Sequence, residues 1–589
     1  KIGQSPKDIF IFDYNTTHNF ANVSDLQPSY QHYELWKLGK ESKPVPPLTE
    51  KQEKISNSIY KPIICTGCAG SGKTLISVYM YCNLLEKEFG SDSGVDSKEL
   101  IYVTYNDNAK NHALAQLREI VGSANAKTIY EFFYEIAKPD LNGLEYADVD
   151  KFIFWWHNEI HDYSFIERIN KLSSYNVEKY VYTFFRGLYK GSMFRWNANI
   201  DNDALTKEQF FALMKSEPVE DEKIDLIWQI CERYRNFQKE NNLYDDNDLA
   251  RRVIRRINKG FLTKYKHVIV DEVQDLTEVQ LEAIVKCSED KRKLYFFGDQ
   301  NQSINPTLFD LNNIQMCLEK NDVSIDPTDI FELHNSYRFG PLLDQYINHL
   351  VALKREWIGT TGIDETESSS KYPEKNRWAG RSNDKAVSEN VLRRASNSAN
   401  AIIIVPDALV KEELRKRFGD ELVKRVTTIY DSKGLEWDYI VLYKMIEFNQ
   451  DKFIEMISGG GKKSTLHRMV FNQFYVGCTR ATTCFSVIEP NLNENVEKII
   501  IGDLQKIQPE NVGLYIEENT DAASWLMEAE RLFEQGAYEL AKHAYEKASV
   551  DITEDFRVEL CDIMCDKEKR SNLDYAMKCK QSCNYREAS

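Results

Sequence analysis

Residues 64–77, which read ICTGCAGSGKTLIS, constrain the fold of this chain more than any other stretch. An apolar strand leads into a glycine-rich turn, and residues of helical character follow. The turn matches G-x-x-x-x-G-K-[ST], so backbone N–H groups and a helix N-terminus are expected to face an anion. Lys73 would reach the β- and γ-phosphates of a nucleotide, and the Thr74 hydroxyl would be offered to Mg²⁺. The glycines of this predicted phosphate loop are Gly67, Gly70 and Gly72.

Strand and helix patterns alternate around this loop, which favours an α/β fold with parallel sheets. Residues 63–66 form the strand that carries the loop. Further buried strands are predicted at 100–105, 266–270, 294–297, 402–405, 439–443 and 484–488.

Three other regions have a different texture. Residues 135–237 are helical and rich in aromatic side chains, which predicts an inserted helical domain. Residues 360–400 are polar and poor in apolar side chains, which predicts a loop or a disordered linker. After about residue 515 the pattern is purely helical, and one tetratricopeptide-type repeat fits the positions of Trp525, Gly536, Tyr538, Ala541, Tyr545 and Ala548.

The composition narrows the functional class. The net charge of −17 disfavours a protein that coats nucleic acid by bulk charge, although a local basic groove stays compatible with it. No apolar run approaches the roughly 18–20 residues of a membrane-spanning helix. The twelve cysteines are scattered along the chain, which favours a reducing intracellular compartment, cytoplasm or nucleus. The chain begins at Lys1 with no signal-peptide pattern, so we expect a trimmed piece of a longer protein.

Two clusters leave alternatives open. Cys561, Cys565, Cys579 and Cys583 have a spacing that would hold zinc if two helices faced each other, but thiols lining helix faces explain it equally simply. The arginines at 251, 252, 255 and 256 would either contact phosphate or form a solvated helix face.

A second nucleotide signal follows at 267–275, HVIVDEVQD. An apolar strand that ends in Asp-Glu suits ATP hydrolysis. Asp271 would hold Mg²⁺, and Glu272 would accept a proton from the attacking water.

With DEVQD, the chain resembles superfamily 1 helicases of the UvrD/Rep class. Residues 48–52 (LTEKQ) resemble the Q motif of that family, in which Gln52 would bind the adenine edge. Residues 104–109 (TYNDNA) resemble motif Ia, and 128–132 (TIYEF) resemble the next DNA-contacting motif. The resemblance implies strand contacts at Thr104, Asn106, Thr128 and Tyr130, although Tyr130 stands where the family usually has His.

The later motifs follow in the family's order. Residues 298–304 match motif III, with Gln302 coupling the γ-phosphate to the strand. Residues 335–338 match motif IV, with Tyr337 stacking on the base and Arg338 near the γ-phosphate. Residues 428–436, hereafter motif V, supply Thr428 and Tyr430 to the strand and Glu436 to the nucleotide, again with Tyr430 in place of His. Residues 475–481 match motif VI and make Arg480 the arginine finger.

The resemblance implies two RecA-like P-loop lobes with an inserted helical subdomain and an all-α, helical-repeat tail. Its boundaries would be 48–134 plus 238–318 for the first lobe, 135–237 for the insertion, 319–510 for the second lobe and 511–589 for the tail. Residues 1–47, with a strand at 8–12, would be a separate N-terminal segment. The implied activity is ATP hydrolysis, with Mg²⁺, that moves single-stranded nucleic acid, DNA rather than RNA, through closing and opening lobes.

One departure weakens part of this expectation. UvrD-type relatives carry a large 2B subdomain between motifs IV and V, whereas residues 339–427 must here also supply second-lobe strands and helices. We therefore expect weak autonomous unwinding, with a protein partner on the tail as a way to complete it. The alternative is an ATP-gated interaction or signalling protein that uses a helicase-like core as a switch.

Overall fold

The computed structural model describes residues 48–565 apart from 90–98, 123, 161–162, 171–176, 194–199, 216, 218, 262–264, 308, 339, 360–367, 371–378, 462–463, 517–519 and 549–555. The strand expected at 8–12 lies outside this part. The chain divides into two compact units, and each is described by itself. The first comprises Lys1–Asn106, Gln116–Glu374 and Asn449–Tyr475; the second comprises Asp107–Ala115, Lys375–Phe448 and Val476–Ser589. Among the described residues, no helix is both long enough and apolar enough to span a membrane.

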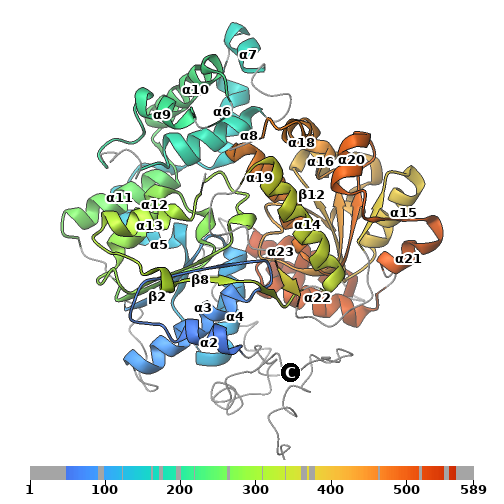
Figure 1. The fold of residues 1–589 in the computed structure, drawn as a ribbon, viewed down its shortest axis with the longest axis horizontal. Coiled ribbons are helices and arrows are strands. Elements are labelled where there is room, and N and C mark those ends of the chain that lie inside the picture. Colours follow the sequence, from blue (N-terminus) through green and yellow to red (C-terminus); the bar gives the residue numbers. More distant parts are fainter. Residues whose placement is uncertain are drawn as a thin grey trace, which may run out of the picture. The chain divides into compact units, whose positions relative to one another are not determined.

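A parallel sheet of six strands forms the centre of the first unit (Figure 1). Its inner strands are buried on both faces, as expected for a parallel sheet covered by helices on either side. The strand order is β3 (Ala126–Thr128), β2 (Leu100–Thr104), β6 (His267–Val270), β7 (Leu294–Gly298), β1 (Ile63–Gly67) and β8 (Ile330–Leu333).

The edge strand β8 corrects one predicted boundary. It pairs in parallel with β1, with Ile330 opposite Ile64, so it belongs to the first sheet. The sequence-based boundary places it in the second lobe, because residues 330–333 alternate only weakly and lack the pattern of a buried strand. The remaining predicted domain boundaries stay predictions.

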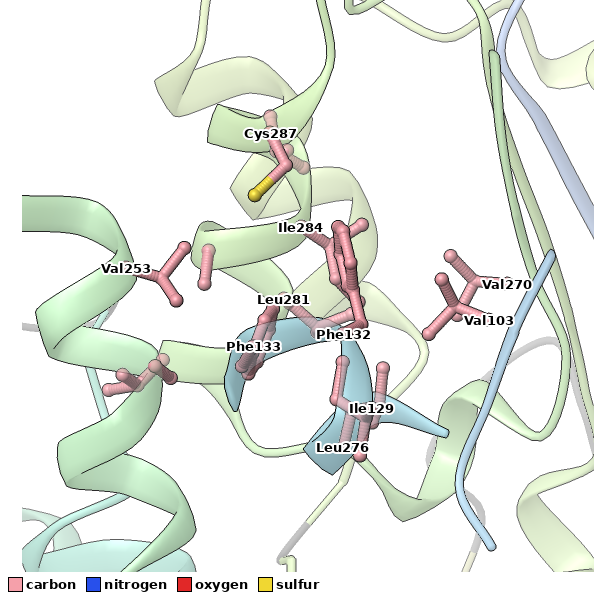
Figure 2. Packing of buried hydrophobic residues seen from close by; sticks show 14 of the residues in the cluster. Val103, Ile129, Phe132, Phe133, Val253, Val270, Leu276, Leu281, Ile284 and Cys287 are labelled. Carbon is pink, nitrogen blue, oxygen red and sulfur yellow. The ribbon is translucent and has the colours of Figure 1, made fainter. Parts of the chain in front are cut away.

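The helices of this unit pack on the sheet through one apolar core. Figure 2 shows Phe132 and Phe133 between the strand valines Val103 and Val270 and the helix residue Val253. The regular helices outside the insertion are α2 (Glu50–Ser56), α3 (Lys73–Leu84), α5 (Ile129–Ala137), α11 (Asp246–Asn258), α12 (Glu278–Cys287), α13 (Asn312–Lys320), α14 (Pro341–Trp357) and α18 (Gln450–Ile457). Two more, α4 (Asp107–Val121) and α19 (Thr465–Thr479), have residues in both units.

The inserted helical subdomain is present as predicted, and it has an aromatic core of its own. Phe152, Trp155 and Tyr234 are buried in mutual contact, with ring centroids 4.7–5.5 Å apart. Its elements are α6 (Val149–Glu159), α7 (Tyr163–Asn170), α8 (Val177–Phe184), the π-helical turn η5 (Phe185–Tyr189), α9 (Lys207–Met214) and α10 (Asp221–Glu240).

The chain leaves for the insertion and returns from it along two paired strands. These are β4 (Glu145–Tyr146) and β5 (Leu243–Tyr244), which run parallel with Glu145 opposite Leu243. Buried ion pairs fasten the insertion to α11, because Arg186 Nη2 lies 2.5 Å from Asp246 Oδ2 and Lys190 Nζ lies 2.9 Å from Asp245 Oδ2.

The arginine cluster on α11 belongs to the same junction. Arg251 is 3% exposed and donates to the carbonyls of Lys190 and Asn202, so it is not on a solvated face. Arg256 pairs with Asp140 at 3.1 Å. The structure thus gives these side chains partners within the first unit.

The second unit holds another parallel six-stranded sheet. Its order is β13 (Val426–Thr428), β12 (Ala401–Val405), β14 (Trp437–Tyr443), β15 (Ala481–Ile488), β11 (Gly380–Ser382) and β16 (Gln505–Lys506). The helices are α15 (Lys385–Ser396), α16 (Ala408–Phe418), α17 (Asp420–Val423), α20 (Glu494–Ile500), α21 (Val512–Tyr515), α22 (Ala522–Glu534), α23 (Tyr538–Ala548) and α24 (Phe556–Cys565).

The loop predicted at 360–400 is wrong over 380–396, which forms β11 and α15. Helix α15 buries Val387, Val391 and Ala395, spaced four residues apart on one face. The low average apolar content of this stretch conceals a narrow amphipathic stripe.

The tail begins as the predicted helical pair. Trp525 on α22 and Tyr545 on α23 are buried, and Gly536 between the helices has φ +83°, which suits a glycine just past a helix end. Of the possible zinc ligands, Cys561 is buried and Cys565 is exposed, whereas Cys579 and Cys583 lie outside the described residues. No candidate metal cluster occurs within the residues described.

Candidate nucleotide-binding site

The phosphate loop joins the end of β1 to the start of α3. Gly72 caps the helix with φ +83°, and Lys73 is the first helical residue. The Lys73 ammonium donates to the carbonyls of Gly67 at 2.8 Å and Cys68 at 3.0 Å. Its Nζ also lies 3.7 Å from Asp299 Oδ2. The cation thus lies over the loop, where phosphate oxygens would replace these acceptors.

Close neighbours explain the glycines of the loop. A Cβ at Gly70 would lie 2.5 Å from the Cβ of Arg338, and the φ of +74° disfavours any other residue there. A Cβ at Gly72 would lie 2.7 Å from Gln52 Nε2. The glycines therefore let motif IV and the Q motif approach the loop.

Gln52 links α2 to the phosphate loop. Its Oε1 accepts from the Thr49 N–H at 2.9 Å as part of a capping box, and its Nε2 donates to the Ser71 carbonyl at 3.0 Å. The side chain is 4% exposed. Here Gln52 supports the loop, and its predicted contact with adenine stays a prediction.

A hydroxyl and a carboxylate meet beside the loop. Thr74 Oγ1 donates to Asp271 Oδ2 at 2.8 Å, and the Tyr102 hydroxyl donates to the same oxygen at 2.8 Å. Burial, with the charge of Glu272, raises the pKa of Asp271 to about 6. Hydroxyl and carboxylate oxygens are the ligands that Mg²⁺ prefers, so these residues fit that cation.

Glu272 follows in a left-handed conformation, with φ +56°. Gln274 Nε2 donates to the Glu272 carboxylate, and Gln274 Oε1 accepts from the Asp299 N–H at 3.1 Å. Asp299 Oδ2 in turn accepts from Gln302 Nε2 at 2.8 Å. A continuous hydrogen-bonded chain therefore connects the predicted base with motif III.

Motif IV also lies against the phosphate loop. The Tyr337 N–H donates to the Gly70 carbonyl at 2.9 Å, and Ser336 Oγ donates to the Ala69 carbonyl at 2.9 Å. These bonds place the backbone of Tyr337 and Arg338 next to the residues that would hold phosphate.

The predicted strand contacts of the first unit lie in two places. Thr104 ends β2 and Asn106 follows it. Thr128 ends β3 and caps α5 through the Glu131 N–H. Tyr130 packs against Tyr134 and Tyr146 and shares a hydrogen bond of 3.0 Å with the Tyr244 hydroxyl, so its ring is partly occupied by this cluster.

The second unit carries the remaining predicted residues. Thr428 Oγ1 donates to Asp431 Oδ2 at 2.6 Å within the motif V turn. Tyr430 and Glu436 are half-buried in the same segment. Arg480 is 2% exposed, and its Nε donates to the Val476 carbonyl at 3.2 Å.

Two residues beside the loop escape the sequence-based prediction. Asp299 stands inside the motif III pattern, so its position next to Gln302 is an available signal. Tyr102 lies within an apolar strand, and nothing in that run distinguishes it from core packing.

The family described as the UvrD/REP helicase N-terminal domain matches residues 48–306. Residues 48–306 belong to the UvrD/Rep helicase family. This match confirms the resemblance that the motifs indicated, and the parallel sheets with their helices agree with the RecA-like lobes of that family.

Curated relatives of this UvrD/Rep-like chain include two proteins named for helicases. It is 24% identical over 289 residues to a probable DNA helicase II homolog of Mycoplasma genitalium, which covers 46% of this chain and 38% of that protein. It is 25% identical over 174 residues to one chain of the ATP-dependent helicase/nuclease of Natranaerobius thermophilus, which covers 27% of this chain and 13% of that protein.

A third relative is TPR and ankyrin repeat-containing protein 1 of Homo sapiens, 23% identical over 235 residues, covering 37% of this chain and 8% of that protein. The chain thus spans well under two thirds of the length of each of these relatives.

Proposed function

We propose that the chain hydrolyses ATP at the phosphate loop of the first unit. The observation that carries this proposal is the contact of Thr74 with Asp271 beside the Lys73 ammonium. Lys73 would bind the β- and γ-phosphates, and Glu272 would take the proton of the attacking water. Mg²⁺, when held by Thr74 and Asp271, would neutralise charge on the phosphates.

The proposed work is movement along single-stranded nucleic acid. Arg338 and Arg480 would stabilise charge on the γ-phosphate, and Gln302 would relay its presence to the strand. Thr104, Asn106, Thr128, Tyr130, Thr428 and Tyr430 are the proposed strand contacts. The helicase names of two relatives favour DNA over RNA.

We expect duplex separation by the isolated chain to be weak. Residues 339–427, where relatives carry 2B, here include α14, β11, α15, β12, α16 and α17. A protein bound to the tail is the proposed source of a missing duplex contact.

The test is the ATPase rate of the purified chain with and without a single-stranded DNA or RNA oligonucleotide. We expect stimulation by the strand and its loss in Lys73→Ala. The surface variant Lys61→Ala, outside the loop, serves as the control. ATP binding without strand-dependent turnover would favour the switch alternative and overturn translocation.

A further inference from the structure

A buried arginine in the second unit directly precedes motif V. Arg425 is 0% exposed and stands one residue before β13. Its Nη2 donates to the carbonyls of Ala399 and Ala401. Within the part of the chain that the structure describes, its Nε and Nη1 have no hydrogen-bond partner. Burial disfavours such a charge unless a carboxylate lies near it.

That carboxylate comes from the tail. Glu528 on α22 is 8% exposed, and its Oε1 lies 3.5 Å from Arg425 Nη2. Arg531 on the same helix holds the other oxygen, with Nε 2.8 Å from Glu528 Oε2. The ring of Trp525 covers the Arg425 guanidinium at 5.2 Å. Three residues of one tail helix therefore surround the buried charge.

The same carboxylate reaches the other end of motif V. Trp437 directly follows Glu436, and its indole Nε1 donates to Glu528 Oε1 at 2.9 Å. Arg531 lies over the Trp437 ring at 5.6 Å. Glu528 thus contacts the residues on both sides of the segment that supplies Thr428, Tyr430 and Glu436.

Trp437 also connects this contact to motif VI. Its backbone N–H donates to the Arg480 carbonyl at 3.1 Å, and Arg480 Nη1 donates to the Leu435 carbonyl at 3.5 Å. The position of the predicted arginine finger therefore depends on backbone at the end of motif V.

We propose that Glu528 is a positioning residue that fixes motif V by holding Arg425 and Trp437 together. The tail would then be an integral part of the second lobe's strand response, beyond any role in partner binding. This inference rests on the proposed function, because motif V is assigned to the strand and the nucleotide there. A buried ion pair is suited to such a role, since it specifies geometry more than it adds stability.

Two substitutions separate positioning from simple attachment of the tail. Glu528→Gln keeps an acceptor for the indole but removes the charge that faces Arg425. Trp437→Phe keeps an aromatic ring and removes the donor. Glu530→Gln, on the same helix and with the same change of charge, is the matched control.

The first measurement is the ATPase kcat with saturating oligothymidylate divided by the kcat without it. We expect Glu528→Gln to lower this ratio by about fivefold or more, Trp437→Phe to lower it in the same direction, and the double variant to fall short of the product of the two. Glu530→Gln should match the wild type. A ratio in Glu528→Gln within about twofold of the control, or rates that fall only in proportion to the folded fraction, would overturn the inference.

The second measurement does not depend on ATP turnover. Amide hydrogen exchange of the full chain without nucleotide should rise in peptides that span 426–437 in Glu528→Gln and stay unchanged in peptides of the phosphate loop. Unchanged exchange at 426–437 rejects the positioning role even if the chain is an active ATPase. A wild-type chain without ATPase activity rejects the proposed function, and exchange then still decides whether Glu528 holds the segment.

Discussion

Glu272 occupies a backbone conformation that a side chain rarely adopts. Its φ of +56° follows the buried strand β6, and Gln274 holds its carboxylate from two residues further on. Left-handed conformations of non-glycine residues are concentrated at functional sites, where surrounding structure enforces them. The conformation turns this carboxylate away from the strand direction while Asp271 stays buried beside Thr74.

Replacing the Glu272 carboxylate by an amide should separate binding from turnover. In Glu272→Gln we expect kcat to fall by about 10²-fold or more, because general-base catalysis is lost, while the Kd for ATP stays within about threefold. Single-turnover hydrolysis and nucleotide binding measured on the same sample provide the check. A wild-type rate would show that another group accepts the proton.

Arg480 belongs to the residue scale as well, although it lies in the second unit. Arg480→Ala should lower kcat by about 10³-fold with little change in nucleotide affinity, as expected for a charge used in the transition state. Arg415→Ala, a surface arginine on α16, is the control. A change in kcat below about threefold would remove Arg480 from the site.

The residues that the sequence predicts well are those in contiguous motifs. Lys73, Thr74 and Asp271 stand in patterns whose spacing fixes their chemistry, and the structure brings them together. Tyr102 and Glu528 are not predictable in this way, because their contacts arise from packing between segments far apart in sequence.

At the scale of elements, strand prediction succeeds where strands are continuously apolar. Strands β1, β2, β6, β7, β12, β14 and β15 all coincide with predicted runs. Strands β8, β11 and β16, at or near the sheet edges, escape it, since so few residues with little apolar content carry almost no pattern. Helix α15 escapes because its apolar stripe is only a few residues wide.

The tail hairpin has a titratable group in its interface. His543 on α23 is 3% exposed, and its ring lies against Trp525. Burial and the charges of Arg425, Lys547 and Lys424, opposed by Glu421, lower the pKa of His543 to about 3. Glu546 Oε2 lies 3.7 Å from its Nδ1.

This shift predicts acid sensitivity of the hairpin. The folded state keeps His543 neutral, whereas the unfolded chain binds a proton near its ordinary value of 6.5. Stability is therefore complete above about pH 6.5 and falls as the pH drops toward 3, by about 2 kcal/mol at pH 5. Thermal unfolding of the full chain at several pH values measures this loss.

The variant His543→Gln should flatten this pH dependence, whatever it does to stability at neutral pH. His157→Gln, at an exposed position on α6, should leave the pH dependence as it is in the wild type. Equal slopes in both variants would contradict the assignment to His543.

At the scale of the whole molecule, the two units divide the predicted chemistry. The first holds the phosphate loop, motif III and motif IV, and the second holds motif V and Arg480. Their net charge is negative in sum, so strand binding must depend on local groups and stacking rather than on the overall field.

We predict that the purified chain displaces streptavidin from the end of a biotinylated single strand in an ATP-dependent reaction but separates a tailed duplex poorly. Movement needs only the groups already present in the two units, whereas strand separation needs a surface that engages the junction. Both assays are run on one preparation, with Lys73→Ala as the inactive control. Robust multi-turnover separation of a long duplex without a partner would contradict this prediction.

The paired strands β4 and β5 give the helical insertion the properties of an exchangeable module. Because the chain departs and returns on neighbouring strands, the distance between the two splice points is fixed by backbone pairing rather than by the inserted helices. A foreign helical module grafted at these points should leave the spacing from β3 to β6 intact. It would need to carry counterparts of Arg186 and Lys190, because the start of α11 otherwise keeps buried carboxylates without these cations.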